Sequence, residues 1–319
     1  MSHRFGGRTP AVLATLVLAA AVGAAPAPAA QSGHNDSDLA ACNALLTESA
    51  LGLGSLDSAR AAAGRGGPIR HEPLMPVTDI EVPAGAVPEV PGNFTATIPV
   101  YFHVINKGPT LADGNVSQAQ IEAQIAALNE TFSGARGGPD TGFRFVLREV
   151  TRTTNQEWFD MTKSRVEREA KRALHQGGTD ALNIYSNSGA GYLGFAYYPK
   201  DVRGRPYIDG IVIAFDSMPG GAIENYDEGF TATHEVGHWL GLAHTFQNGC
   251  STKGDGVDDT PAQRFPTTGC PEGQDTCPKD PGLDPIHNYM DYSYDDCYTE
   301  FTAGQAQRMA EQWLYFRAP

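Results

Sequence analysis

The chain has 319 residues, of which 37 are acidic and 23 are basic, and its formal net charge is −14. An acidic surface of this kind repels phosphate backbones, so nucleic acid is excluded as an expected partner. The charge favours solubility but says nothing about the fold.

The N-terminus has the pattern of a secretory signal. Arg4 and Arg8 precede an apolar, alanine-rich run at residues 11–25, and Ala27-Pro28-Ala29 is a small-x-small cleavage site. We therefore predict a signal peptide at residues 1–29 and a secreted, extracellular protein. No other segment approaches the roughly 20 apolar residues of a transmembrane helix, so we expect no membrane attachment after signal removal. An uncleaved interfacial anchor is the alternative.

Residues 30–92 have the composition of a linker. They contain one helical stretch at residues 38–63, a glycine-rich run at 64–68 and five further prolines. Such a segment cannot bury a core of its own. We expect it to lie outside the catalytic domain.

From residue 93 the pattern becomes that of a folded domain. Alternating hydrophobicity predicts strands at residues 95–105, 143–150 and 182–185, and helical periodicity predicts helices at 117–132, 165–175 and 302–316. A further helix is expected to begin near residue 230. Mixed strands followed by helices predict an α/β upper subdomain, one central helix and an irregular lower subdomain.

Residues 234–244 carry the pattern His-Glu-x-x-His-x-x-Gly-x-x-His. His234 and His238 lie about one helical turn apart, so both imidazoles can reach one ion. Gly241 can adopt positive φ, which allows the chain to turn back and bring His244 as a third ligand. The pattern predicts a zinc site with an open fourth position, as in catalytic sites. A buried helix with hydrogen-bonded histidines is the alternative, but each buried group would then need its own partner.

Three segments together resemble the pappalysin family of metzincin zinc metallopeptidases, in particular its small secreted microbial members. They are HEVGHWLGLAHTF at 234–246, DGVDDTPAQ at 255–263 and NYMDYSYDDCYTEFTAGQAQRM at 288–309. The zinc motif followed by a methionine turn, here at Met290, is the metzincin signature. LGFAYYP at 193–199 and DGIVIAF at 209–215 resemble the strand pair that precedes the zinc helix in that family.

The resemblance implies a mixed α/β, metzincin-type zincin fold over residues 93–319. Its upper subdomain would hold a twisted mixed sheet and helices, followed by the zinc helix. Its lower subdomain would be irregular, stapled by disulfides and closed by a C-terminal helix.

The chain has five cysteines, and four of them cluster in the lower subdomain, at 250, 270, 277 and 297. In an exported protein these predict two disulfides, with three possible connectivities. A four-cysteine zinc site is the alternative. The resemblance implies the pairs Cys250–Cys277 and Cys270–Cys297.

Because secreted peptidases must stay inactive until export, we interpret residues 30–92 as a propeptide and the whole chain as a zymogen. The unpaired Cys42 could act as a latch whose thiolate takes the fourth zinc position. It could equally be a free thiol or pair with another chain, since the residues beside it differ from those that frame the family's latch. We expect cleavage within residues 60–70, a stretch of small residues and three arginines.

The sequence also predicts which residues take part in catalysis and which support the site. Glu235 is expected to act as general base toward the zinc-bound water and to return the proton to the leaving amine. The resemblance implies that Tyr292 stabilises the oxyanion, with a packed aromatic as the alternative, and that Met290 is structural, beneath the metal.

Two carboxylate groups carry further predictions. The resemblance places Asp296 in the pocket for the residue after the cut bond, where it would favour Arg or Lys; a solvated aspartate is the alternative. Calcium is expected at an oxygen-rich loop, with a plain acidic turn as the alternative. The loop's ligands would be Asp255, Val257, Asp258, Asp259 and Thr260.

The sequence therefore predicts a secreted zinc endopeptidase, and a non-catalytic, metal-stabilised binding module on the same scaffold is the alternative. The cofactors would be Zn²⁺ and Ca²⁺. The partner would be an extended peptide or protein bound along the strand at residues 194–198, with the enzyme acting as a monomer.

Overall fold

The computed structural model describes Met1 and residues 70–73, 81–83 and 85–319. The chain divides into two compact units, Met1–Asn43 and Ala44–Pro319, and the second carries all the elements described below. The signal peptide and the helix that we predicted at residues 38–63 lie outside the described residues, as does Cys42.

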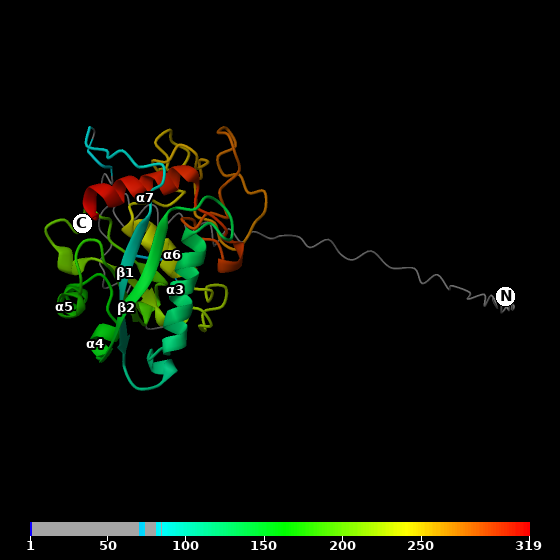
Figure 1. Cartoon of the computed structure of the whole chain (residues 1–319). Helices are drawn as coiled ribbons and strands as arrows, with labels where there is room; N and C mark the ends of the chain where they lie inside the picture. The colour runs from blue at the N-terminus through cyan, green and yellow to red at the C-terminus, as the bar shows by residue number, and fades with distance from the viewer. Residues whose placement is uncertain (2–69, 74–80, 84) are drawn as a thin grey trace. The chain divides into compact units, whose positions relative to one another are not determined.

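A five-stranded mixed sheet forms the framework, with strand order β2-β1-β3-β5-β4 (Figure 1). The four parallel strands are β1 (Ala96–Asn106), β2 (Phe143–Thr154), β3 (Leu182–Asn187) and β5 (Ile211–Ala214). The two-residue strand β4 (Gly194–Phe195) pairs antiparallel with β5 at one edge. β3 and β5 are buried along their whole length, as expected of parallel strands covered on both faces.

Helices α3 (Gln118–Phe132) and α6 (Phe230–Trp239) pack against each other, and α3 also packs on β2 (Figure 1). α3 begins where Ser117 and Gln120 form a capping box. Every residue of α6 is buried, so this helix can carry polar side chains only where they have partners or bind a ligand. No helix within the described ranges is long and apolar enough to cross a bilayer.

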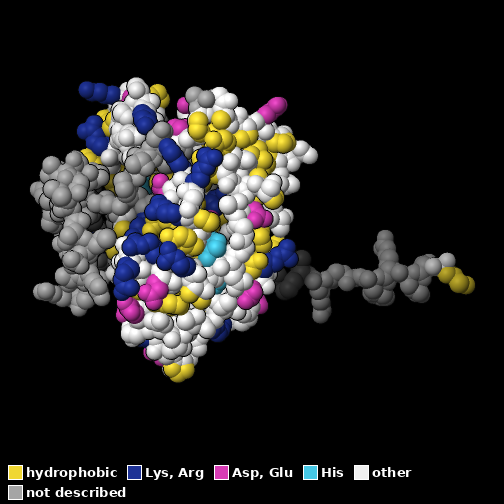
Figure 2. All heavy atoms as spheres, turned by 90° about the vertical axis from the view of Figure 1, so that its left-hand side faces the viewer, with side chains coloured by type: hydrophobic (Ala, Val, Ile, Leu, Met, Phe, Trp, Pro, Cys, Tyr) yellow, Lys and Arg dark blue, Asp and Glu magenta, His cyan; other side chains and the backbone are white. Residues whose placement is uncertain are grey.

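Shorter elements complete the upper part: α4 (Gln156–Phe159), α5 (Arg165–Leu174), and the 3-10 turns at Leu111–Asp113, Gly189–Gly191, Pro206–Ile208 and Phe215–Ser217. Although the chain is acidic overall, α5 exposes Arg165, Arg168 and Arg172. The face of the molecule that carries α5 is correspondingly rich in basic side chains (Figure 2).

The region after α6 is irregular up to the 3-10 turn Asp295–Cys297 and the final helix α7 (Ala303–Phe316) (Figure 1). Two disulfides staple it, Cys250–Cys277 and Cys270–Cys297, which is the pairing that the resemblance implied. Directly after α7, the guanidinium of Arg317 donates to Asp209 at 2.6 Å and to the Trp239 carbonyl at 2.9 Å. This buried contact ties the C-terminal helix to the end of α6.

Candidate metal and catalytic site

The third histidine reaches the site because α6 ends in a Schellman motif. The N–H of Gly241 donates to the His238 carbonyl, and the N–H of Leu242 donates to the Gly237 carbonyl, both at 2.9 Å. Gly241 has φ +94°, a value that residues with a Cβ rarely adopt. The chain therefore reverses within two residues, and His244 returns to the side of the helix that carries His234 and His238.

The three imidazoles converge through their Nε2 atoms. Nε2 of His238 lies 3.1 Å from Nε2 of His234 and 3.1 Å from Nε2 of His244. On the opposite side of two of these rings, Nδ1 of His234 donates to the Tyr289 carbonyl and Nδ1 of His238 donates to the Leu242 carbonyl, both at 2.7 Å. These donations leave the Nε2 lone pairs facing one another, which is the arrangement of metal ligands.

The donor set fits zinc. Two nitrogens bound at 2.0–2.1 Å to one tetrahedral ion lie about 3.3 Å apart, close to the spacing of these rings. Burial, reinforced by the neighbouring imidazoles, lowers the pKa of His234, so the ring is neutral as a ligand must be. Burial also lowers the pKa of His244.

Met290, to which the resemblance gave a structural role beneath the metal, packs against α6. It is fully buried, and a Cβ at Gly237 on α6 would collide with its sulfur. The preceding residue, Tyr289, supplies the carbonyl that orients His234. The turn at Tyr289 and Met290 therefore fixes the position of His234 through packing and one hydrogen bond.

Glu235 lies against the edge strand of the sheet. Its side chain is 1% exposed and its Oε2 has no hydrogen-bond partner among the described residues. A Cβ at Gly194 in β4 would lie 2.8 Å from Glu235 Oε1, so only glycine fits there. Burial raises the pKa of Glu235 well above its ordinary value, and the nearby carboxylate of Glu72 raises it further.

A residue that the sequence did not indicate completes the cluster. Glu72 Oε1 lies 2.5 Å from Nε2 of His244 and 3.5 Å from Nε2 of His238. Tyr292 donates its hydroxyl to the same oxygen at 3.1 Å, which places this tyrosine beside the three histidines. No spacing rule links Glu72 to the zinc motif, because more than 150 residues of sequence separate them.

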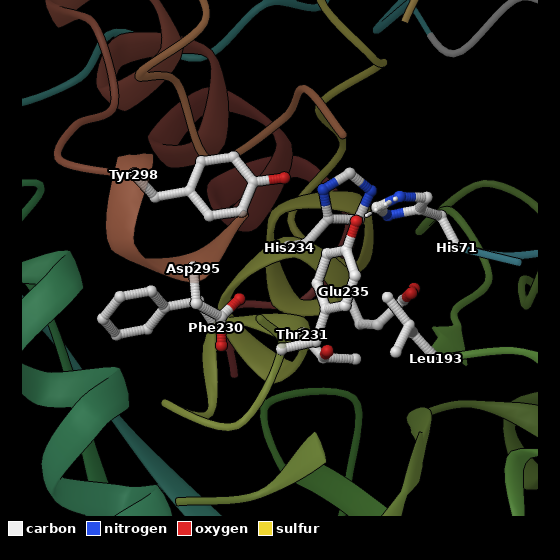
Figure 3. A pocket seen from close by; sticks show the side chains of 9 residues that line it. His71, Leu193, Phe230, Thr231, His234, Glu235, Asp295 and Tyr298 are labelled. Atoms are coloured by element: carbon white, nitrogen blue, oxygen red, sulfur yellow. Dashed lines mark hydrogen bonds between the residues drawn. The ribbon is translucent and has the colours of Figure 1, made fainter. Parts of the chain in front are cut away.

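A pocket opens beside His234 and Glu235. Figure 3 shows Tyr298 and Asp295 on one side of this pocket and His71 and Leu193 on the other. The remaining lining residues are Tyr226, Phe230 and Thr231.

Besides Glu235, the pocket is lined by the carboxylate of Asp295, which is 2% exposed. Asp296, which we predicted there, is exposed and does not line the pocket. Successive side chains of the Asp295–Cys297 turn point in different directions, so neighbouring aspartates have different surroundings. Burial raises the pKa of Asp295 to about 7, although its Oδ2 accepts a 2.9 Å hydrogen bond from the Glu228 N–H.

In the oxygen-rich loop, most of the candidate calcium ligands already make hydrogen bonds within the protein. Asp259 accepts from the Thr302 hydroxyl at 2.7 Å and the Gly304 N–H at 2.8 Å, at the start of α7. Asp258 is exposed, and Asp255 Oδ1 accepts from the Val257 N–H. Within the described residues, Asp255 Oδ2 and Thr260 Oγ1 are buried without a hydrogen-bond partner. Calcium at this loop stays a prediction.

Comparison with known proteins finds metalloprotease relatives. A family model described as pregnancy-associated plasma protein-A, peptidase M43, matches residues 181–313. The chain is 45% identical over 228 residues to an extracellular metalloprotease of Neurospora crassa, a match that covers 70% of this chain and 77% of the relative. It is 46% identical over 225 residues to extracellular metalloprotease 1 of Coccidioides posadasii, covering 69% and 78% respectively.

Two solved structures share the fold at 30% sequence identity. Mature mirolysin of Tannerella forsythia, in complex with a cleaved peptide, gives a TM-score of 0.58 and covers 71% of this chain and 99% of that chain. A promirolysin variant gives 0.60 and covers 72% and 84%. The fold class expected from the sequence is therefore confirmed.

Proposed function

We propose how the site works in this chain, which belongs to the pappalysin family of secreted zinc metallopeptidases, peptidase family M43. His234, His238 and His244 would hold the zinc ion. When bound, zinc polarises the scissile carbonyl and lowers the pKa of the attacking water. The observation that carries the proposal is the convergence of three Nε2 atoms beside a buried glutamate with an unpartnered oxygen.

Glu235 is the general base. A carboxylate with a raised pKa accepts a proton from water more readily, and the same group then delivers that proton to the leaving amine. Tyr292 lies beside the histidines, where its hydroxyl can donate to the oxyanion of the transition state.

The substrate binds as an added strand. β4 has one side paired with β5, and its other side can accept the backbone of an extended peptide. This strand lies against Glu235, so the peptide would run past the general base. Every group used in this mechanism comes from one chain, in keeping with action as a monomer.

Preference for Arg or Lys after the cut bond would come from Asp295. Its buried carboxyl lines the pocket beside Glu235, and an ion pair with a basic side chain is strongest where water is excluded. Asp296, the residue first expected in this role, serves as the matched comparison because it is exposed.

A calcium ion at the oxygen-rich loop remains part of the proposal. The support is the buried pair of unpartnered oxygens, Asp255 Oδ2 and Thr260 Oγ1, together with hard-cation chemistry that suits carboxylate and hydroxyl oxygens. Residues 30–92 are proposed as the propeptide.

The experiment is hydrolysis of a quenched-fluorescent peptide library by the processed protein and its Glu235→Gln variant. We expect kcat to fall by about 10²–10⁴-fold with bound zinc unchanged. Glu122→Gln, an exposed position on α3, is the matched control and keeps full activity. A wild type that binds one zinc per chain but cuts no peptide would favour the binding module instead.

Cut positions in the same library test the pocket. Asp295→Asn is expected to weaken the preference for Arg and Lys, whereas Asp296→Asn leaves it unchanged. The reverse result would return the role to Asp296.

A further inference from the structure

The carboxylate of Glu72 occupies the remaining side of the three-histidine cluster. Its ligand oxygen and the three histidine nitrogens all lie within 4.8 Å of one another. The distances to His244 and His238, 2.5 and 3.5 Å, lie on either side of the roughly 3.3 Å expected between two ligands of one tetrahedral zinc ion. Glu72 thus stands where the fourth ligand of such an ion belongs.

The surroundings of this carboxylate favour binding of a cation. The Glu72 side chain is 2% exposed, and its Oε2 has no hydrogen-bond partner among the described residues. Beyond the imidazoles, the hydroxyl of Tyr292 donates to Oε1. Burying a carboxylate that faces neutral imidazoles is unfavourable, and a metal ion between them removes that penalty.

The backbone around Glu72 is held by the substrate-binding edge. The Arg70 N–H donates to the Gly191 carbonyl at 3.0 Å, and the Leu193 N–H donates to the Arg70 carbonyl at 2.8 Å. The Gly194 N–H donates to the His71 carbonyl at 3.1 Å, and Arg70 forms a parallel bridge with Tyr192. Residues 70–73, called here the 70–73 segment, are therefore held through Arg70 and His71 at the edge proposed for the peptide.

His71 fills the pocket beside this edge. Its ring, labelled in Figure 3, has its Nε2 3.2 Å from the Tyr226 hydroxyl. The ring also stacks on Tyr292, at 4.0 Å between centroids and 5° between planes. About 20 Å³ of the pocket remains free, roughly the room for one water molecule. That space is too small for the Arg or Lys side chain proposed to bind there.

We propose that Glu72 is the fourth zinc ligand of the uncut chain and that the 70–73 segment occupies the substrate site. The assignment rests on the proposed function, because it requires zinc at the three histidines. A site with four protein ligands has no position for the attacking water, so the uncut chain is inactive. The latch is then a carboxylate, in place of the thiolate predicted for Cys42.

The position of Glu72 also constrains maturation. A cut within residues 60–70 leaves Glu72 attached to the catalytic domain. Release of the ligand requires a cut on its C-terminal side, so we expect the N-terminus of the active enzyme to lie beyond residue 73.

The test uses the full chain in a Glu235→Ala background, which prevents self-cleavage, with Co²⁺ in place of zinc. Four proteins are compared: the background, Glu72→Ala, Cys42→Ala and Glu81→Ala. Glu81 is the matched control, because it is another carboxylate of the same N-terminal region and pairs with Arg308 at 3.4 Å, away from the histidines. The readouts are the visible spectrum of bound cobalt and the rate of metal transfer to a chelator.

We expect Glu72→Ala to change the cobalt spectrum and to speed metal transfer by at least about tenfold. Cys42→Ala and Glu81→Ala are expected to match the background. A thiolate-to-cobalt band that disappears in Cys42→Ala, or a Glu72→Ala protein identical to the background, overturns the assignment. Proteins that bind no metal at the histidines overturn the proposed function itself, and metal content separates that outcome from the others.

Discussion

Two regions of the molecule were expected to bind metal, and they treat their donor atoms differently. In the histidine cluster, each of two rings uses its Nδ1 to bind a backbone carbonyl, which leaves the Nε2 atoms turned toward one point. In the oxygen-rich loop, both carboxylate oxygens of Asp259 accept hydrogen bonds from the start of α7. A metal site is thus indicated by ligand atoms that have no other hydrogen-bond partner. A cluster of acidic residues alone is a weaker indication of metal binding.

The largest expected effect comes from removing a convergent nitrogen. His238→Ala takes away the ring whose Nε2 lies 3.1 Å from both of the others. We expect loss of zinc and a fall in kcat/KM of at least about 10³-fold, since metal polarisation supplies several kcal/mol. Metal analysis and peptide hydrolysis measure both, and a variant that keeps one zinc and its activity would contradict the site.

The second effect concerns the unpartnered oxygens of the loop. Asp255→Asn is expected to abolish stabilisation by calcium, which for the wild type would be about 2.7 kcal/mol at a calcium concentration 100 times Kd. The measurement is thermal unfolding with calcium and with a calcium-selective chelator. A wild type whose Tm ignores calcium would make this loop an acidic turn.

The third prediction concerns the acidity of Asp255. Burial raises the pKa of Asp255 to about 7, and in the unfolded chain it is near 4. Without calcium, the folded state therefore binds one more proton between pH 4 and 7, and stability increases as pH falls through that window. Compared with Asp255→Asn, the metal-free wild type is expected to gain stability from pH 8 to 5. Equal pH profiles would contradict the buried position.

The smallest expected effect shows whether Asp259 caps helix α7 or binds calcium. Asp259→Ala is expected to cost about 1 kcal/mol, because it removes acceptors at the start of α7, and the cost is expected to be the same with or without calcium. Asp258→Ala, at the exposed neighbouring position, serves as the control and is expected within about 0.5 kcal/mol of wild type. A calcium-dependent cost at Asp259 would restore it as a ligand.

Local signals predicted the central part of this molecule well. Ser117 and Thr302 cap helices α3 and α7 where the sequence indicated, and strand β1 begins one residue from its predicted start. Gly241 ends the zinc helix because a glycine with positive φ permits the reversal. Each of these features depends on residues only a few positions apart.

Features that depend on distant contacts were not predictable in this way. Glu72 meets the histidines because the two residues before it, Arg70 and His71, pair with the edge of the sheet. The choice between Asp295 and Asp296 depends on the rotation of one short turn, which the sequence does not specify. The predicted strand at residues 194–198 is reduced to Gly194–Phe195, because β5 pairs with only two residues there.

Because its backbone is paired within the same chain, the 70–73 segment also holds the Glu72 carboxylate close to the histidines. A carboxylate on the same chain meets the histidines at an effective concentration of the order of millimolar or more, whatever the amount of protein present. Dilution after secretion therefore cannot release it, whereas a single cut converts it into a separate peptide that dilution removes. The activity per enzyme molecule would then depend on whether the chain has been cut and would not depend on the protein concentration.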